Sequence, residues 1–451
     1  MPLHSGALTS WEGVQQGAFL ICGTTSVMPN QTFPHRSPDG ADPVQSFYEA
    51  HPYPRPIEDL DSYQKSWGEP LRRRAEFHRF WPNKPIREDL TILIAGCGTS
   101  QAAKYAMRWP KARITGVDFS LKSIEHTQKL KKKYSLSNLE VHPLPIEQIG
   151  QLERQFDLII STGVLHHLPD PDAGISALSA CLAPGGAMHV MVYAPYGRTG
   201  IYMLQDYCRR LKIGSSSSEI RDLAASLRAL PPDHPLLPLL RNSPDFRSEA
   251  ALADALLHPQ DRSYTVEQFI KFIEAAGLQF DRWVRQAPYS PHCGGMTQVP
   301  HAALLERLPE REQFVAMELF RGNMLRHSAI VSPRNAEQPT RSVSFEDEVW
   351  LDYIPIRLFE TISVEEKLPP SAAAVLINQS HTQTDIYLPI SALQKKMVDR
   401  INGARTIRQI VDQVGSQSDA RTLFRRLWWY DQVVFDASLA GVAAQNKEGG
   451  S

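Results

Sequence analysis

Apolar and amphipathic stretches alternate along the middle of the chain. The apolar runs are short and continuous, as in strands buried on both faces of a sheet, and stretches with helical periodicity separate them. The predicted strands are residues 92–95, 114–118, 139–144, 156–161 and 188–193. The predicted helices are residues 102–108, 120–134, 146–154 and 173–182, with Ser120 as an N-cap. This order predicts an α/β fold with a parallel sheet covered by helices on both faces.

The alternation stops after residue 193. Residues 197–260 have a helical character and no strand pattern, so they predict a helical insertion at the carboxyl edge of the sheet, where a lid or a substrate-binding element is common. A helix at 265–276 and strands at 279–285 and 328–331 then follow. These two strands could complete the sheet.

The N-terminal part has a different composition. Residues 1–45 have little periodicity and predict a loose arm, and residues 46–90 predict a Pro-rich cap followed by a helix at 62–80. The prolines within residues 47–56 favour an extended backbone that presents Tyr48, Tyr53 and Arg55 in fixed directions. This stretch is either a rigid surface linker or a cap over the active site.

The C-terminal part predicts a second folded unit. We expect a domain at 91–332, a polar linker at 333–345, a small α+β domain at 346–438 and a tail at 439–451. Three short helices and a strand suggest a winged-helix-like domain, and Thr406 with Gln409 forms a capping-box signature. Its arginines could form a DNA-facing surface, although a solvated arginine face is the commoner arrangement.

Charge and cysteine content narrow the class of partner. The chain has 48 Lys and Arg against 49 Asp and Glu, so a nucleic-acid partner is not expected. The five cysteines are scattered without a Cys-x-x-Cys spacing, which favours a reduced, cytoplasmic protein without structural zinc. The start lacks a basic leader, and no apolar run approaches the roughly 18 residues of a membrane span. The oligomeric state cannot be inferred from these features.

A glycine-containing turn at residues 96–98 lies between the first predicted strand and helix, and Asp118 ends the second strand. The bare backbone at Gly96 and Gly98 allows a sharp turn and close ligand approach, and an acid at the position of Asp118 can accept hydrogen bonds from ribose hydroxyls. Gln101 replaces the third glycine of a dinucleotide-binding fingerprint, and Gly98 is not followed by the lysine of an ATP-binding P-loop. A different nucleotide-like ligand is therefore expected.

Residues 91–193 resemble a class I S-adenosylmethionine-dependent methyltransferase. The matching motifs are Ile92 to Ser100, Gly116-Val-Asp-Phe-Ser120, Phe156 to Ser161 with Val164-Leu-His-His-Leu-Pro-Asp-Pro171, and Leu182-Ala-Pro-Gly-Gly186. The resemblance implies a Rossmann-like, seven-stranded sheet whose last strand is antiparallel. The later strands near residues 281–284 and 328–331 could be the sixth and seventh.

The resemblance also implies S-adenosyl-L-methionine as the cofactor. The residues expected to bind it are Ala95, Gly96, Cys97, Gly98, Asp118, Phe119, Pro145, Ile146, Thr162, Gly163 and Val164. The adenine would be held by backbone and apolar contacts at residues 144–146, where many members of the family carry an acid or an amide.

Methyl transfer from a sulfonium requires positioning and exclusion of water, so neither a metal nor a covalent intermediate is predicted. His166 or His167 is a candidate general base, because imidazole titrates near neutrality, although the motif could instead line the cofactor or pack under its loop. The residues expected to bind the acceptor are Tyr48, Tyr53, Arg55, Tyr193, Tyr196 and Arg198. Tyr48 to Arg55 resembles a Tyr-x-x-x-x-Tyr-Pro-Arg segment upstream of the glycine loop in some bacterial members.

Two functions are consistent with these patterns. The first is a methyltransferase that acts on a small molecule or a peptide. The second is a regulatory or scaffold protein that binds the cofactor without turnover, while its C-terminal unit binds a peptide or nucleic acid. Residues 388–414 are similar to small peptide-binding domains of the pyrroloquinoline-quinone chaperone type, which accompany peptide-modifying enzymes.

Overall fold

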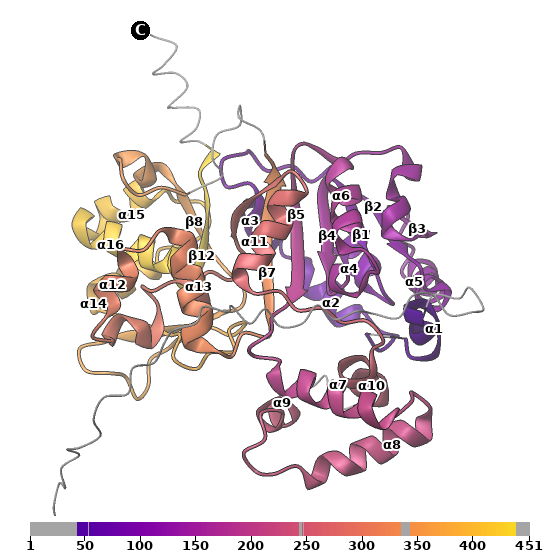
Figure 1. Ribbon diagram of the computed structural model, residues 1–451. Coiled ribbons are helices and arrows are strands. Elements are labelled where there is room, and N and C mark those ends of the chain that lie inside the picture. The colour runs from indigo at the N-terminus through magenta and orange to yellow at the C-terminus, as the bar shows by residue number, and fades with distance from the viewer. Residues whose placement is uncertain (1–42, 53, 243–245, 247, 335–342, 439–451) are drawn as a thin grey trace, which may run out of the picture.

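The computed structural model describes residues 43–52, 54–242, 246, 248–334 and 343–438 (Figure 1). In these residues the chain forms three parts: a sheet with helices on both faces, a helical lobe inserted between β5 and β6, and a C-terminal unit. Most of the predicted N-terminal arm, residues 335–342 of the predicted linker, the tail at 439–451 and Tyr53 lie outside the described residues.

The central sheet has seven strands in the order β3-β2-β1-β4-β5-β7-β6. Its strands are β1 Thr91–Ala95, β2 Arg113–Asp118, β3 Leu139–Pro143, β4 Phe156–Thr162, β5 Leu182–Tyr193, β6 Leu278–Trp283 and β7 Arg326–Pro333. The first five strands are parallel, and β7 is antiparallel to both β5 and β6. The predicted α/β class and the seven-stranded sheet with an antiparallel last strand are confirmed.

Both faces of the sheet are buried, as the continuous apolar strands predicted. In β1, Ile92 and Ile94 belong to one apolar cluster and Leu93 and Ala95 to another. The first cluster includes side chains of α3 Pro70–Phe80, α4 Gln101–Arg108 and α5 Leu121–Lys133. The second includes side chains of α6 Pro171–Ala180, α11 Val266–Ala275 and α13 Glu310–Arg321. Ser120 caps α5, as expected, by accepting a hydrogen bond from the Ser123 amide.

The region before the sheet differs from the prediction. Instead of starting an extended segment, Tyr48 lies in α1, which spans Pro43–Ala50. Residues 62–80 form two helices, α2 Asp61–Trp67 and α3, rather than one. Gly68 closes α2 and Pro70 begins α3, because proline cannot donate the backbone hydrogen bond of a helix interior but fits the first helical turn.

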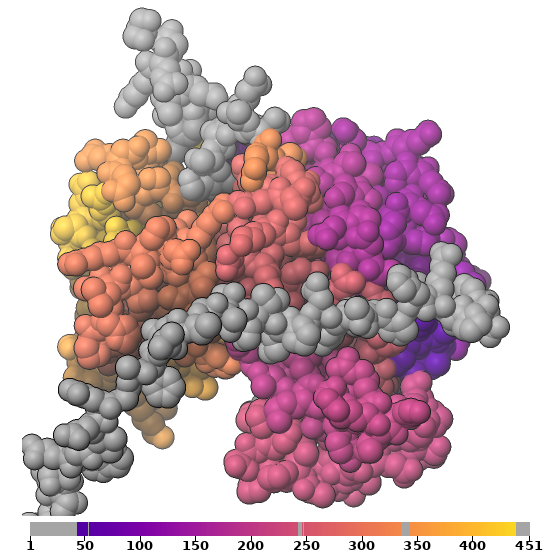
Figure 2. Space-filling view, viewed as in Figure 1, coloured from indigo at the N-terminus to yellow at the C-terminus, as the bar shows by residue number. Residues whose placement is uncertain are grey.

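The insertion is helical, as predicted, and forms a separate lobe. Its helices are α7 Thr199–Leu211, α8 Ser217–Ser226, α9 Leu237–Asn242 and α10 Glu249–Leu257. Figure 2 shows this lobe projecting from the core of the molecule. Leu204, Leu223 and Leu256 are among the residues of its apolar core, which also includes Phe47 of α1. The lobe and the N-terminal helix therefore share one core.

The C-terminal unit contains more strands than the sequence predicted. Its elements are β8 Ile354–Arg357, β9 Thr361–Val364, β10 Ala374–Asn378, β11 Leu388–Ile390, α14 Ala392–Val398, α15 Ile407–Val414, α16 Gln417–Trp429 and β12 Val433–Asp436. The three helices and the last strand are as expected, and Thr406 and Gln409 form the predicted capping box of α15. The additional strands form a three-stranded sheet, β11-β10-β9, and pair β12 with β8.

The C-terminal unit packs directly on the core of the molecule. Its apolar cluster includes Ala75 of α3, Ala287 and Cys293, and the Arg74 guanidinium donates to Asp436 at 2.6 Å. The short helix α12 Ala302–Glu306 precedes α13.

The helices of the described residues were also compared with the length and apolar character of a membrane span. Among the residues that the structure describes, none of the helices is long and apolar enough to cross a membrane.

Candidate functional site

The turn between β1 and α4 requires glycine at its first position. Gly96 has a φ of 71°, and a Cβ added there would lie 2.4 Å from Cγ2 of Val164. The amides of Gly96 and Cys97 both donate to the Val117 carbonyl at 2.9 Å, which fixes the turn against the end of β2. The Cys97 side chain is buried, so only the backbone of this turn is available for a ligand.

Asp118 at the end of β2 holds two neighbouring segments together. Its Oδ2 accepts a hydrogen bond from the Gly98 amide at 2.8 Å, and its Oδ1 accepts one from the Ser120 amide at 2.9 Å. Burial raises the pKa of Asp118, while these two amide donors act in the opposite direction. A carboxylate has about four acceptor positions, so the bonds to the Gly98 and Ser120 amides do not use all of them, and Asp118 can still accept from a ligand such as a ribose diol.

A single cavity of about 1900 Å³ connects the glycine turn to the inserted lobe. Most of the residues predicted to bind a cofactor or an acceptor line it. These are Gly96, Cys97, Gly98, Asp118, Phe119, Pro145, Ile146, Thr162, Gly163, Val164, His167, Tyr48, Tyr193, Tyr196 and Arg198. The carboxyl ends of β1, β2, β4 and β5 meet at this edge of the sheet, and this topology brings the distant motifs together.

Three of the predicted residues lie elsewhere. Ala95 is fully buried in the same apolar cluster as Leu93 and does not line the cavity. His166 is also fully buried, with its ring 4.1 Å from that of His167 and 4.0 Å from that of Tyr193 between centroids, so it does not face the cavity. Arg55 is exposed and does not line the cavity. Direct contact of these three side chains with a ligand in the cavity is therefore not supported.

Helix α1 covers the site and joins its two sides. The Gln45 side chain donates to the Phe119 carbonyl at 2.9 Å, next to Asp118. The Tyr48 hydroxyl donates to Oδ1 of Asp254 in α10 at 3.1 Å. Figure 1 shows α1 beside α5, near the inserted lobe. Gln45 and Tyr48 of α1 line the cavity, so this part of the predicted cap lies at the site as a helix and not as an extended backbone.

A cluster of polar side chains is buried where the end of β5 meets the inserted lobe. The Arg198 guanidinium stacks on the Tyr193 ring at 3.5 Å and lies 3.4 Å from Asp261. His258 stacks against His167 with ring centroids 4.0 Å apart. All of these side chains except the half-buried Tyr193 are at least nine-tenths buried.

Asp254, His258 and Asp261 are not among the site residues predicted from the sequence. The sequence does contain one indication that Asp254 is unusual. It interrupts the otherwise apolar stretch Ala250 to Leu257. A buried acid in such a stretch needs a polar partner, and here that partner is Tyr48. The identity of the partner could not be predicted, since the two residues are 206 positions apart.

The other end of the cavity lies between the sheet and the C-terminal unit. Arg285 and Arg326 line it, together with Glu360 and Gln383 from the C-terminal unit. Burial, followed by the nearby Arg326, lowers the pKa of Arg285 to about 10. This end of the cavity therefore carries positive charge close to the C-terminal unit.

Comparison with known proteins places the glycine turn in a recognised domain. Residues 93–188 match the family model described as a methyltransferase domain. The malonyl-[acyl-carrier protein] O-methyltransferase of Acetivibrio thermocellus is 32% identical over 109 residues, which are 24% of this chain and 36% of that protein. The residues matched by the family model include the end of β1, the glycine turn, Asp118 and β4.

Two further proteins match larger parts of the chain. An uncharacterized protein of Synechococcus sp. is 32% identical over 257 residues, which are 53% of this chain and 60% of that protein. The structure of PKMT2 from Rickettsia typhi matches with a TM-score of 0.57 at 18% identity, and the match covers 82% of this chain and 75% of that one. A second structure of PKMT2 holds AdoHcy. At this identity the structural match shows a shared fold alone.

The fold, the site and these matches define the class of the domain. The sheet has the Rossmann-like arrangement of seven strands, and residues 93–188 within it match a methyltransferase domain. The chain spans less than two thirds of the length of the curated relatives named above.

Proposed function

We propose that the whole protein is an S-adenosylmethionine-dependent methyltransferase that acts on a small-molecule or peptide acceptor. The observation that carries this proposal is the shared cavity, in which the glycine turn and Asp118 lie at one side and His167, Tyr193 and Arg198 at another. Its volume of about 1900 Å³ exceeds the roughly 300 to 1,000 Å³ of a typical small-molecule site, so it can hold a cofactor and an acceptor together.

The residues present fit the cofactor. Asp118 keeps acceptor positions for ribose hydroxyls while its bonds to the Gly98 and Ser120 amides hold it in place. Residues 144–146 line the cavity, and in this proposal they make the backbone and apolar contacts to the adenine ring. When bound, S-adenosylmethionine supplies an activated methyl group on its sulfonium.

The protein's contribution to an in-line displacement is to align the acceptor and to exclude water. Helix α1 and the inserted lobe perform the second task, because Tyr48 and Asp254 bridge the two elements across the cavity. Tyr193 and Arg198 line the cavity at the carboxyl end of β5 and are placed to orient the acceptor.

His167 is the better placed of the two candidate bases. Its Nδ1 lies 2.8 Å from the Gln260 carbonyl, which can only accept a hydrogen bond, so Nδ1 carries the proton and Nε2 keeps its lone pair. His167 lines the cavity and His166 does not. In this proposal Nε2 of His167 accepts the proton that a hydroxyl or ammonium acceptor must lose.

A nucleic-acid acceptor is not favoured by the C-terminal arginines. Arg408 pairs with Asp352 at 3.0 Å, Arg421 donates to the Glu346 carbonyl, and Arg425 stacks on Trp429 at 4.5 Å. Guanidinium groups engaged within the unit are less available for phosphates, which supports the solvated-face interpretation.

A cytoplasmic location is part of the same proposal, because the four described cysteines are free thiols.

Calorimetry with AdoHcy, the demethylated product, tests the cofactor site. We expect the parent to bind AdoHcy and Asp118→Ala to lose about 2 to 3 kcal/mol of binding free energy, since a charge-assisted contact to ribose disappears. Asp222→Ala, which removes an exposed acid of α8, is the control and should bind like the parent. A parent that fails to bind AdoHcy would overturn the proposal.

Turnover is then measured as AdoHcy accumulation with a panel of hydroxyl, amine, thiol and peptide acceptors. Product formed with one class of acceptor, and lost in Asp118→Ala, supports the enzyme. Cofactor binding without turnover across the panel would instead favour the regulatory or scaffold function.

A further inference from the structure

The buried polar cluster beneath the inserted lobe contains one subset with the composition of a metal site. His166 and His167 lie in the 3-10 turn Leu165–His167 after β4, and Asp261 lies between α10 and α11. One nitrogen of each histidine and one carboxylate oxygen of Asp261 all lie within 4.8 Å of one another. All three residues are at least nine-tenths buried.

Several polar atoms in this cluster have no hydrogen-bond partner. Within the described part of the chain, both ring nitrogens of His166, Nε2 of His258 and Oδ1 of Asp261 are buried and unpaired. Leaving a buried polar group unpaired costs about 1 to 3 kcal/mol, and more for a charged group. His166 and Asp261 both belong to the three-residue group above, so their unpaired atoms are available to a ligand.

The atoms that do have partners leave the metal-binding lone pairs free. His167 uses Nδ1 for the Gln260 carbonyl, so its Nε2 has a lone pair. Asp261 uses Oδ2 for the Gln205 amide at 3.0 Å and for Arg198 at 3.4 Å, so its Oδ1 remains free. Metal-binding histidines and carboxylates in proteins are commonly oriented by outer partners of these kinds.

We propose that His166, His167 and Asp261 bind one divalent transition-metal ion. Two imidazoles and one carboxylate suit zinc, cobalt or iron(II), and leave coordination positions for water or substrate. Ligand atoms that share an ion at about 2.1 Å are at most about 4.2 Å apart, so small side-chain rotations must close the cluster on binding. No metal was predicted from the sequence, because methyl transfer from a sulfonium requires none, and Asp261 comes from a segment far from the two histidines.

The local charge is compatible with a cation. Asp254 and Asp261 are both buried in this cluster, and the Arg198 guanidinium pairs with Asp261. Arg198 contacts Oδ2 of Asp261, which is the oxygen that the proposed ion does not use. Two carboxylates and one guanidinium leave a formal charge of −1 to be balanced when both acids are ionised.

The consequence for catalysis rests on the proposed function. His167 lines the cavity, so an ion on its Nε2 would lie next to the acceptor. The same nitrogen cannot bind an ion and accept a proton, so the metal would replace His167 as the group that promotes ionisation of a hydroxyl acceptor. In that case the hydroxyl proton passes to solvent, the oxygen lone pair forms the bond to the methyl carbon, and the carbon–sulfur bond breaks to release AdoHcy.

The test uses the full chain after dialysis against a chelator and then against metal-free buffer. Titration with Co²⁺ is followed by its visible absorption, and the metal retained after gel filtration with Zn²⁺ is measured by mass spectrometry. We expect one ion per chain for the parent. His166→Ala and Asp261→Asn should each weaken binding at least tenfold, while His301→Ala, which removes an exposed histidine, should not change it.

Folding and cofactor binding are checked in the same samples. Circular dichroism and AdoHcy calorimetry without metal show whether each variant is folded, and His167→Gln provides a third ligand variant if His166→Ala is not. Failure to retain a stoichiometric ion would overturn the metal site, as would equal binding by folded His166→Ala. Failure to bind AdoHcy would count against the proposed function alone, so the two failures are distinguishable.

Discussion

Gly96 combines two requirements that only glycine meets. Its φ of 71° is disfavoured for residues with a side chain, and a Cβ would collide with Val164 at 2.4 Å. We predict that Gly96→Ala loses measurable AdoHcy binding and is destabilised by more than the roughly 1 to 2 kcal/mol of the left-handed backbone alone. Calorimetry and urea unfolding measure the two effects.

Gly277 is a matched control for this substitution. It has almost the same φ, 72°, but a Cβ there would meet nothing within 4 Å. Gly277→Ala should therefore cost only the backbone term and leave AdoHcy binding intact. Adding Val164→Ala to Gly96→Ala should recover part of the lost stability. Equal losses for the two glycine variants would contradict the steric argument.

Asp254 should give the stability of the protein a characteristic pH dependence. Burial raises its pKa from 3.8 to about 6, with His167 and the Tyr48 hydroxyl acting in the opposite direction. Because the folded-state pKa lies above the unfolded-state value, the contribution of Asp254 is fully present below about pH 4 and is lost as the pH rises through about 6.

Comparison with Asp254→Asn isolates this effect from that of other acids. A shift of about two units corresponds to about 3 kcal/mol, so the parent should lose up to that amount relative to the variant between about pH 4 and pH 7. The measurement is urea unfolding of both proteins in metal-free buffer across this range. A stability difference that does not change with pH would show that Asp254 titrates normally.

The elements of the sheet could be predicted from the sequence because their signals are local. Ser120 occupies an N-cap position, and the turn at Gly96 to Gly98 separates an apolar strand from a helix. The number of strands and the antiparallel direction of the last strand came from the family resemblance. These features depend on backbone geometry and on burial of both sheet faces, both of which leave a periodic pattern.

The elements around the site could not be predicted in the same way. Helix α1 forms in a segment rich in proline, where its Phe47 packs into the core of the inserted lobe and Tyr48 bonds to Asp254. Both contacts depend on how the lobe folds back over the sheet. The sequence therefore indicated which motifs line the cavity, but not that His166 is buried outside its lining or that Asp261 lies beside the two histidines.

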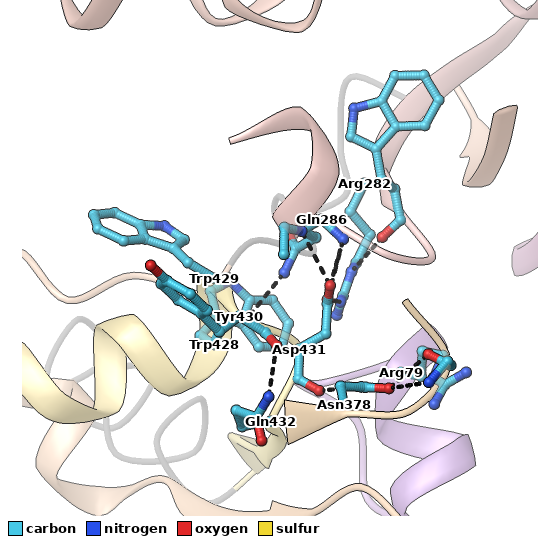
Figure 3. A network of polar contacts seen from close by, with 12 residues as sticks. Arg79, Arg282, Gln286, Asn378, Trp428, Trp429, Tyr430, Asp431 and Gln432 are labelled. Carbon is cyan, nitrogen blue, oxygen red and sulfur yellow. Dashed lines mark hydrogen bonds and ion pairs between the residues drawn. The ribbon is translucent and has the colours of Figure 1, made fainter. Parts of the chain in front are cut away.

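At the scale of the whole molecule, the C-terminal unit is joined to the sheet through Asp431. Its carboxylate accepts hydrogen bonds from the amides of Gln286 and Ala287 at 2.8 and 3.0 Å, and it lies 3.0 Å from Nε2 of His381. Figure 3 shows Asp431 between Gln286 and Arg282, whose guanidinium stacks on Trp428. This junction is next in sequence to residues of the positively charged end of the cavity, since Arg285 precedes Gln286 and Thr382 follows His381.

In this junction the carboxylate of Asp431 compensates the buried positive charge of Arg282. Burial lowers the pKa of Arg282 to about 10, and Asp431, 4.0 Å away, acts in the opposite direction. We predict that Asp431→Asn destabilises the protein by on the order of 3 kcal/mol, since it leaves a buried guanidinium without its counter-charge. Asparagine tolerates the φ of 52° at this position, so backbone strain does not contribute to the expected loss of stability.

Urea unfolding, followed by tryptophan fluorescence and by circular dichroism, measures this loss. Asp412→Asn, which neutralises an exposed acid of α15, is the control and should change stability by less than about 0.5 kcal/mol. Adding Arg282→Met to Asp431→Asn removes the uncompensated charge and should recover part of the stability. If Asp431→Asn alone unfolds like the parent, the junction is held by the apolar cluster around Ala287 and Cys293 rather than by the charge of Asp431.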